Sequence, residues 1–330
     1  MPRIMINGFG RIGRTVLRQL LRDPAHADIE IAAINDIAPL DMCAYLFRYD
    51  SVFGPWPGEV GAEDGHLTVS GRRIPFWQCA DLSGRDLAGV DVVLECTGTA
   101  HTRPRAEAGI VAGARAVLVS GPSEAADQTI VLGANDAGLG PGRIISNASC
   151  TTNAIGPLLA ALDAALGIET AHVTTVHCYT GSQPTVDAPG ASHERSRAAA
   201  VSMVPTTTSA AGQVTKVLPR LAGRLSVAAI RVPVISVSTI DATIRLSDCP
   251  DGDFNAVLRT TFAGSPLVGM IEDPCVSTDL RGRAESVILA LPETMRVGAD
   301  QVRIMGWYDN EWGFSARMID MTRRIAARRC

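Results

Sequence analysis

Cys150 is the residue of this sequence best placed to act as a nucleophile. It lies between a β-rich run that ends at Ser146 and an apolar helical run, which places it at a helix N-terminus. There the helix dipole and the free N–H groups favour a thiolate, so we expect a lowered thiol pKa. Free cysteines are more often small buried hydrophobes, but hydroxyl groups of Ser149, Thr151 and Thr152 flank this one. The pattern favours covalent catalysis through Cys150.

His177 is the candidate proton carrier for that thiol. It closes a β-rich run 27 residues after Cys150, so a helix and a returning strand could bring the two side chains together. His172 lies in the same run at an odd separation and is expected to face the opposite side of the sheet. A lone histidine is more often structural than catalytic, so a chance pairing is the competing interpretation.

A glycine loop near the N-terminus predicts a dinucleotide site. Gly8, Gly10 and Gly13 follow a strand and open a helix, and Asp36 ends the next strand 23 residues after Gly13. Glycine permits a tight turn and close approach of the backbone to a pyrophosphate, and the helix N-terminus favours an anion. Asp36 would accept hydrogen bonds from the ribose hydroxyls of NAD and repel the extra phosphate of NADP. A glycine turn in a nucleotide-free α/β protein is the alternative.

The elements that must hold these residues differ between the two halves of the chain. The first half alternates β-rich runs with helical stretches, including a helix over residues 11–22, which predicts parallel strands joined by crossovers. From Cys150 a helical run through Leu166 leads into longer strands, which predicts a mixed or antiparallel sheet. The predicted strands are residues 3–7, 29–35, 90–96, 116–120, 143–146, 171–179, 226–233, 234–246, 286–291 and 302–308.

These patterns predict an α/β protein with two domains. Residues 1–149 form a Rossmann-type domain with a doubly wound parallel sheet, and residues 150–313 form an α+β catalytic domain with a mixed or antiparallel sheet. A length of 330 residues, 46% of them hydrophobic, suits two cores. The polar stretch 180–203 is expected to be a functional loop, and a last helix over residues 315–328 carries an apolar face that must dock on another element.

Composition excludes several classes of partner. A net charge of −4 with 19% charged residues gives no basic surface for nucleic acid or an anionic membrane. The eight cysteines include no C-x-x-C pair, so neither a metal cluster nor a disulfide framework is expected, and a reducing compartment fits. With no recognisable signal peptide or membrane span, we expect a cytoplasmic protein.

Several motifs together resemble the phosphorylating glyceraldehyde-3-phosphate dehydrogenases. They occur in the family's order along the whole chain, and the eight-residue cysteine motif is highly specific. The matching segments are residues 7–14 (NGFGRIGR), 146–153 (SNASCTTN), 174–177 (TTVH), 231–233 (RVP) and 307–311 (WYDNE).

The resemblance implies NAD-dependent oxidation of D-glyceraldehyde 3-phosphate to 1,3-bisphosphoglycerate. Cys150 would form a hemithioacetal and then a thioester, with His177 as base, and inorganic phosphate would cleave the thioester. It also implies a homotetramer and a C-terminal segment, residues 314–330, packed on the cofactor domain. The implied phosphate ligands are Ser149, Thr151, Thr180, Arg195, Thr208, Ser209 and Arg231, and the implied cofactor ligands are Gly8, Gly10, Arg11, Ile12, Gly13, Asp36, Ser120 and Asn310.

The chain departs from the family pattern at a few positions. Ser209 and Gly212 stand where the family usually has glycine and lysine, so we expect the side chain at position 209 to crowd a backbone contact with the attacking phosphate. Ala80 replaces an arginine often found near the adenine, and Phe314 replaces a frequent tyrosine. Arg197 is the alternative to Arg195 if the loop register differs by two.

Three rival functions remain at this stage. Erythrose-4-phosphate dehydrogenases share the cysteine motif but lack a threonine at the position of Thr180, which favours the triose phosphate. A preference for NADP would be expected to change Asp36 or Pro189. The third rival is a non-catalytic NAD-binding protein that uses Cys150 as a redox sensor.

Overall fold

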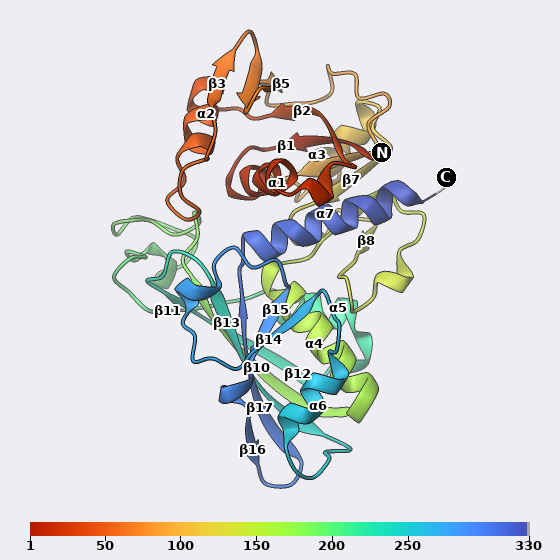
Figure 1. Ribbon diagram of the computed structural model, residues 1–330, viewed down its shortest axis with the longest axis vertical. Coiled ribbons are helices and arrows are strands. Elements are labelled where there is room, and N and C mark those ends of the chain that lie inside the picture. Colours follow the sequence, from red (N-terminus) through yellow and green to blue (C-terminus); the bar gives the residue numbers. More distant parts are fainter. Residues whose placement is uncertain (329–330) are drawn as a thin grey trace. The chain divides into compact units, whose positions relative to one another are not determined.

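The computed structural model describes residues 1–328, and the chain divides into two compact units (Figure 1). The first comprises residues 1–130, 137–148 and 315–330, and the second comprises residues 131–136 and 149–314. Position 329 and Cys330, the end of the predicted C-terminal segment, lie outside the described residues. Within those residues no helix combines the length and the apolar composition needed to cross a membrane.

The first unit is built on a nine-stranded sheet in the order β3-β4-β5-β2-β1-β6-β7-β9-β8. The strands from β5 to β8 in this order pair in parallel, which confirms the predicted doubly wound sheet. Strand order reverses at β1, because β2 lies on one side of it and β6 on the other. These parallel strands are β1 (Arg3–Asn7), β2 (Glu30–Asn35), β5 (Arg72–Trp77), β6 (Val92–Glu95), β7 (Ala116–Val119), β8 (Gln128–Thr129) and β9 (Ile144–Ser146).

Three helices connect or cover these strands: α1 (Arg11–Arg22), α2 (Leu40–Arg48) and α3 (Arg103–Val111). Helix α1 has the predicted bounds and buries Val16, Leu17 and Leu20. The side chains of Met5, Val93 and others pack into one core cluster around the central strands. The nucleotide-binding end of such a sheet is therefore a rigid platform, since close-packed cores deform little.

An antiparallel extension, β3 (Val60–Glu63) and β4 (His66–Val69), was not predicted. β3 pairs with β4 and β4 pairs with β5, both antiparallel. The two hairpin turns contain Asp64-Gly65 and Ser70-Gly71, and all four residues have positive φ angles. This is the conformation of type I′ hairpin turns, for which Asp-Gly and Ser-Gly pairs are suited.

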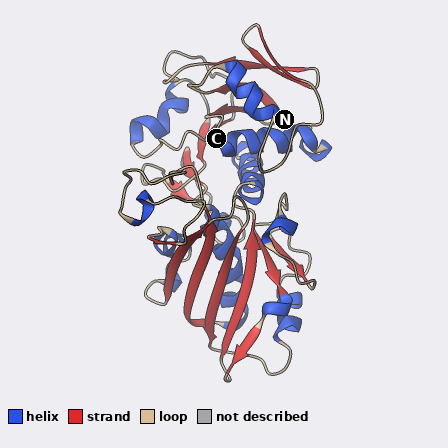
Figure 2. Cartoon of the chain, turned by 90° about the vertical axis from the view of Figure 1, so that its left-hand side faces the viewer, coloured by secondary structure: helices blue, strands red, loops and turns tan. Residues whose placement is uncertain are grey.

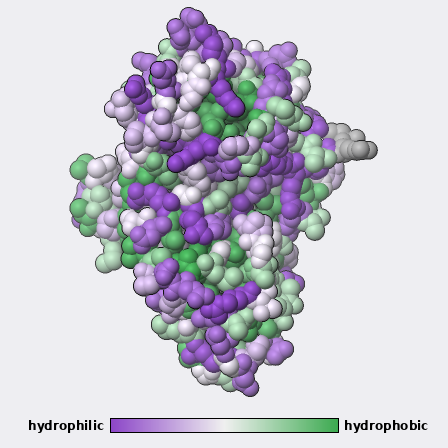
Figure 3. All heavy atoms as spheres, in the orientation of Figure 1, coloured by the Kyte–Doolittle hydropathy of each residue, from purple (hydrophilic) through white to green (hydrophobic). Residues whose placement is uncertain are grey.

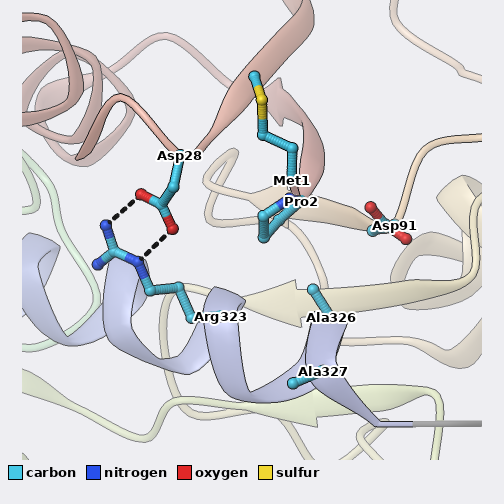
Figure 4. A pocket seen from close by; sticks show the side chains of 7 residues that line it. All are labelled: Met1, Pro2, Asp28, Asp91, Arg323, Ala326 and Ala327. Atoms are coloured by element: carbon cyan, nitrogen blue, oxygen red, sulfur yellow. Dashed lines mark hydrogen bonds and ion pairs between the residues drawn. The ribbon is translucent and has the colours of Figure 1, made fainter. Parts of the chain in front are cut away.

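Helix α7 (Trp312–Ala327) returns to the first unit from Ser315 onward. Arg115 donates hydrogen bonds to the carbonyl groups of Ile325 and Ala326. Arg323 holds both carboxylate oxygens of Asp28, at 3.0 and 2.7 Å, beside a pocket of about 440 Å³ (Figure 4). Because the charged groups of this pocket are already paired, they anchor the helix and offer little to a ligand.

The second unit contains an eight-stranded mixed sheet, as predicted (Figure 2). Its main order is β11-β12-β10-β13-β17-β15-β14, with β16 paired to β17. β10 pairs in parallel with β12 and antiparallel with β13. The strands are β10 (Ile168–Cys178), β11 (Val204–Thr206), β12 (Leu225–Val232), β13 (Ser238–Leu246), β14 (Val268–Ile271), β15 (Val287–Ala290), β16 (Met295–Val297) and β17 (Gln301–Tyr308).

Helices lie behind this sheet in the view of Figure 2, and within residues 1–328 no helix covers the face turned toward the viewer. Helix α4 (Cys150–Leu166) packs against β10, β13, β15 and β17, α5 (Ala210–Val217) packs against β12, and α6 (Phe254–Thr261) packs against α4. Short 3₁₀ helices cover Pro24–His26, Asp136–Gly138, Glu194–Ser196, Pro219–Leu221, Ser277–Leu280 and Leu291–Glu293.

Candidate active site

The thiol of Cys150 stands at the first residue of α4, as the sequence predicted. Ala148 adopts a positive φ of 53°, which turns the chain sharply before the helix and is uncommon for a residue with a side chain. Ser149 then caps the helix, because its Oγ accepts a hydrogen bond from the Thr152 N–H at 3.0 Å. The cap fixes the start of α4 and therefore the position of the sulfur.

His177 reaches that sulfur from β10. Its Nε2 lies 3.5 Å from Cys150 Sγ, within the range of a hydrogen bond to sulfur. The side chain is buried, whereas His172 on the same strand is exposed and contacts Ser226 and Thr174. The alternation expected from the pleat therefore selects His177, and the structure brings the predicted nucleophile and base together.

Arg231 occupies the other side of the imidazole. Parallel pairing of β10 with β12 sets His177 directly beside Arg231, and the guanidinium NH1 lies 2.6 Å from His177 Nδ1. The carbonyl oxygen of Cys178 accepts a hydrogen bond from the same NH1 at 2.8 Å and lies 2.7 Å from Nδ1. A single backbone carbonyl thus positions both the base and the cation.

These surroundings keep the imidazole neutral. Burial, together with the positive charge of Arg231, lowers the pKa of His177 to about 3. A protonated ring would place two positive charges 2.6 Å apart in a buried site. The neutral ring can carry its proton on either nitrogen, and the tautomer with the proton on Nδ1 leaves Nε2 free to accept the thiol proton.

The predicted lowering of the Cys150 pKa is wrong. Burial raises the pKa of this thiol and outweighs the opposing effects of the Arg231 charge and the hydrogen bonds at the helix start. The sequence pattern located the helix N-terminus but could not show how far the sulfur is buried. The pair is therefore a neutral thiol facing a neutral imidazole.

Tyr308 joins the site although the sequence analysis assigned it no role. Its buried hydroxyl lies 2.9 Å from Thr151 Oγ1 and 2.7 Å from Thr175 Oγ1. Its ring meets the His177 ring edge to face, with centroids 5.9 Å apart. Tyr308 therefore supports the helix start and the base at once. Its place in the motif at residues 307–311 was the signal available in the sequence.

The remaining candidate phosphate ligands lie on short segments of the second unit. Arg195 donates to Thr206 Oγ1 at 2.6 Å, which fixes it on β11, the strand next to that of Arg231. Its rival Arg197 instead pairs with Asp187 at 2.8 Å. The contacts of the other candidates are local: Thr180 with Ser182, Thr208 with the N–H of Ala210, and Ser209 as the exposed N-cap of α5.

A cleft of about 690 Å³ lies in the first unit at the carboxyl ends of the parallel strands, where strand order reverses. Gly8, Gly10 and Asp36 line it. A Cβ atom on Gly8 would lie 2.5 Å from the Thr97 nitrogen, and one on Gly13 would lie 2.1 Å from the Gly8 oxygen. Both positions therefore require glycine.

The carboxylate of Asp36 is fixed at the edge of this cleft. Its oxygens accept hydrogen bonds from the N–H groups of Phe9 at 2.6 Å and Ala38 at 2.9 Å. The first of these bonds ties the end of β2 to the glycine loop. Each carboxylate oxygen retains a lone pair, so the group can also accept hydrogen bonds from a diol.

A buried polar network that the sequence analysis missed forms part of the cleft lining. Glu95 accepts a hydrogen bond from Asn7 at 2.5 Å, and Asn35 donates to Asn7 Oδ1 at 2.8 Å. Burial raises the pKa of Glu95. The network ties together the ends of β1, β2 and β6. No local sequence signal identifies it, because its members lie on separate strands.

The other candidate cofactor residues have different surroundings. Arg11 directs its guanidinium to Asp50 at 2.6 Å, so a cofactor would meet its backbone. Ile12 is partly buried and follows it in α1, and the Ser120 N–H bonds to the Glu95 carbonyl. Asn310 belongs to the second unit, where its Oδ1 lies 3.1 Å from Cys178 Sγ. Of the departures, Ala80 lines the cleft and accepts a hydrogen bond from Arg105, and Phe314 is buried.

Comparison with known proteins gives matches along nearly the whole chain. Residues 2–103 match the NAD-binding domain family of glyceraldehyde 3-phosphate dehydrogenase, and residues 149–310 match the C-terminal domain family of that enzyme. A glyceraldehyde-3-phosphate dehydrogenase of Pseudomonas aeruginosa is 44% identical over 332 residues, covering 99% of each chain. The enzyme of Xanthobacter flavus is 43% identical, with 96% of each chain covered. The enzyme of Kitasatospora aureofaciens is 44% identical, with 99% of this chain and all of the relative covered. The resemblance read from the motifs is confirmed, together with the α/β fold class, the oxidoreductase class and NAD as cofactor.

Proposed function

Because this chain belongs to the glyceraldehyde-3-phosphate dehydrogenase family, we propose that it oxidises glyceraldehyde 3-phosphate to 1,3-bisphosphoglycerate with NAD and inorganic phosphate. The observation that carries the proposal is the 3.5 Å contact between Cys150 Sγ and His177 Nε2 beside the Arg231 guanidinium. A nucleophile, a base and a cation for phosphate are the groups this reaction needs.

The residues of the cleft fit NAD. Helix α1 begins at Arg11 without a side-chain cap at Gly10 and without an acidic residue in its first turn, so its N-terminus suits a pyrophosphate. Asp36 offers two carboxylate oxygens for ribose hydroxyls and would repel a ribose phosphate. NAD, when bound, supplies the acceptor for the hydride that leaves the substrate carbon.

Bond formation at Cys150 requires removal of the thiol proton. As the sulfur attacks the aldehyde carbon, the proton passes to His177 Nε2 and then to the substrate oxygen, which gives a hemithioacetal. Because burial raises the Cys150 pKa, we propose that proton transfer to His177 Nε2 accompanies attack on the carbonyl.

Oxidation and release use the same two residues. His177 takes the hydroxyl proton of the hemithioacetal as the hydride leaves, and the product is a thioester on Cys150. An inorganic phosphate oxygen then attacks the thioester carbon, the carbon–sulfur bond breaks, and the sulfur departs as a thiolate that His177 can reprotonate. The proposed ligands of the two phosphates are the side chains of Arg231, Arg195 and Thr180, together with the hydroxyl groups of Ser149, Thr151, Thr208 and Ser209.

We also propose a cytoplasmic homotetramer. Large apolar side chains are exposed on α2, at Met42, Tyr45 and Leu46, and just before β11, at Val201 and Met203. Exposed apolar residues of this kind suit a subunit interface. Figure 3 shows hydrophobic residues interspersed among hydrophilic ones on one face. The seven cysteines in residues 1–328 are free, which agrees with a reducing compartment. Light scattering after size-exclusion chromatography measures the mass of the assembly. The mass of a monomer would contradict the proposed homotetramer.

The direct test is NAD reduction with glyceraldehyde 3-phosphate, measured by the absorbance of NADH, with and without inorganic phosphate. We expect sustained turnover only with phosphate, and near-complete loss in Cys150→Ser with NAD binding retained. Activity with erythrose 4-phosphate alone would move the substrate assignment to the rival enzyme. NAD binding without turnover on either aldehyde would favour the redox-sensor alternative.

A further inference from the structure

Cys178 lies between two groups that the proposed reaction needs. Its backbone carbonyl contacts both His177 and Arg231, and its backbone N–H donates to Ser238 Oγ at 3.1 Å. Its fully buried side chain makes two contacts, with Sγ 3.1 Å from Asn310 Oδ1 and 3.7 Å from His177 Nδ1. The backbone of this residue therefore holds the base, and the shorter contact of its thiol holds Asn310.

The chemistry of the two side chains sets the direction of this hydrogen bond. Burial raises the pKa of Cys178 to about 12, so the side chain is a thiol at neutral pH and can donate its S–H. The oxygen is the acceptor of an asparagine amide, whereas its NH₂ group only donates. The thiol must therefore face Oδ1, and the Asn310 NH₂ group must point the other way.

That NH₂ group has no hydrogen-bond partner among residues 1–328, although Asn310 is only 8% exposed. A donor that no protein group accepts from, on a side chain that is otherwise buried, is suited to a ligand acceptor. The acceptor must be a carbonyl or similar oxygen. The carboxamide of nicotinamide presents such an oxygen next to the reactive ring.

We propose that Cys178 is a positioning residue that fixes the Asn310 amide with its NH₂ group toward the carboxamide oxygen of bound NAD. The inference rests on the proposed function, in which Asn310 is one of the cofactor ligands implied by the family resemblance. Without the thiol donor the amide can turn over and present its oxygen, which repels a carbonyl oxygen. Cys178 then selects the orientation of the nicotinamide end of NAD and leaves the adenosine end unaffected.

The test compares two ligands that share all but the nicotinamide. Dissociation constants of NAD and of ADP-ribose are measured by calorimetry for the wild type, Cys178→Ala and Cys178→Ser. We expect Cys178→Ala to weaken NAD binding about 5- to 10-fold, the effect of roughly one hydrogen bond. ADP-ribose binding should not change. Cys178→Ser keeps a donor and should bind NAD within about 3-fold of the wild type.

Further variants separate positioning from a general loss of structure. Cys178→Val fills the space without a donor and should reproduce the alanine result, whereas wild-type NAD binding in this variant would show that the alanine effect comes from lost volume. In an Asn310→Ala background, Cys178→Ala should have no further effect on NAD, since the two residues act through one contact. Equal weakening of both ligands, or none for NAD, would overturn the inference. A wild-type protein that binds no NAD would overturn the proposed function itself and this inference with it.

Discussion

Replacing His177 with asparagine should remove a specific part of the protein's acid sensitivity. In the folded protein the pKa of His177 is lowered to about 3, against an ordinary value of 6.5 for histidine. Folding therefore favours the neutral ring, and its stabilising contribution is complete above about pH 6.5 and is lost as the pH falls toward 3. His177→Asn has no group that titrates in this window.

The size of the effect follows from the two pKa values. Between them the unfolded chain binds one more proton than the folded chain, so stability falls by about 1.4 kcal/mol per pH unit. From pH 7 to pH 5 the wild type should lose roughly 2 kcal/mol through His177 alone. The side chain is only 4% exposed, so solvent screens this interaction little.

The measurement is urea denaturation of wild type and His177→Asn at pH 7 and pH 5. The decrease in the free energy of unfolding between the two pH values is compared between the two proteins. His172→Asn, an exposed imidazole on the same strand, is the matched control and should keep the wild-type pH dependence. Arg231→Met should reduce the difference, because the guanidinium is the second cause of the lowered pKa after burial. An equal loss of stability in wild type and His177→Asn would refute the reasoning.

Two substitutions test the hydrogen bonds of the Tyr308 hydroxyl and the proposed phosphate ligand Ser209. Tyr308→Phe removes the hydroxyl that bonds Thr151 and Thr175 and should lower the free energy of unfolding, measured in urea, by about 1 to 2 kcal/mol. Tyr45→Phe, at an exposed position, is the control and should change it little. Equal changes in the two variants would contradict a structural role for the Tyr308 hydroxyl. Ser209→Ala removes an exposed hydroxyl at the start of α5 and should raise KM for inorganic phosphate about 3- to 10-fold without changing KM for the aldehyde. An unchanged phosphate KM would remove Ser209 from that pocket.

Local patterns predicted the parts of the fold that depend on nearby residues. The glycine loop and α1 were located because the glycine spacing lies within one βαβ unit, where contact with the Gly8 oxygen requires glycine at position 13. β3 and β4 were missed although Asp64-Gly65 and Ser70-Gly71 are hairpin signals, so that omission was avoidable. Local pattern is therefore sufficient to indicate these elements as well.

Contacts between distant residues set the limit of what could be predicted in the site. The Tyr308–Thr151 contact spans 157 residues, and the His177–Arg231 contact depends on the register between β10 and β12. A shift of one residue in that register would send Arg231 to the other face of the sheet. The predicted pKa of Cys150 failed for the same reason, because burial comes from the whole unit while the helix dipole is local.

The charge of Arg231 acts in opposite directions on the two reacting residues. It lowers the pKa of Cys150, which favours the nucleophile, and it lowers the pKa of His177, which weakens the base. A substrate phosphate bound to Arg231, as the proposed function requires, would offset this positive charge at both positions. The His177 pKa would then rise and the ring would accept a proton more readily. It follows that, under the proposed function, His177 is a stronger base when the substrate phosphate is bound than when it is not.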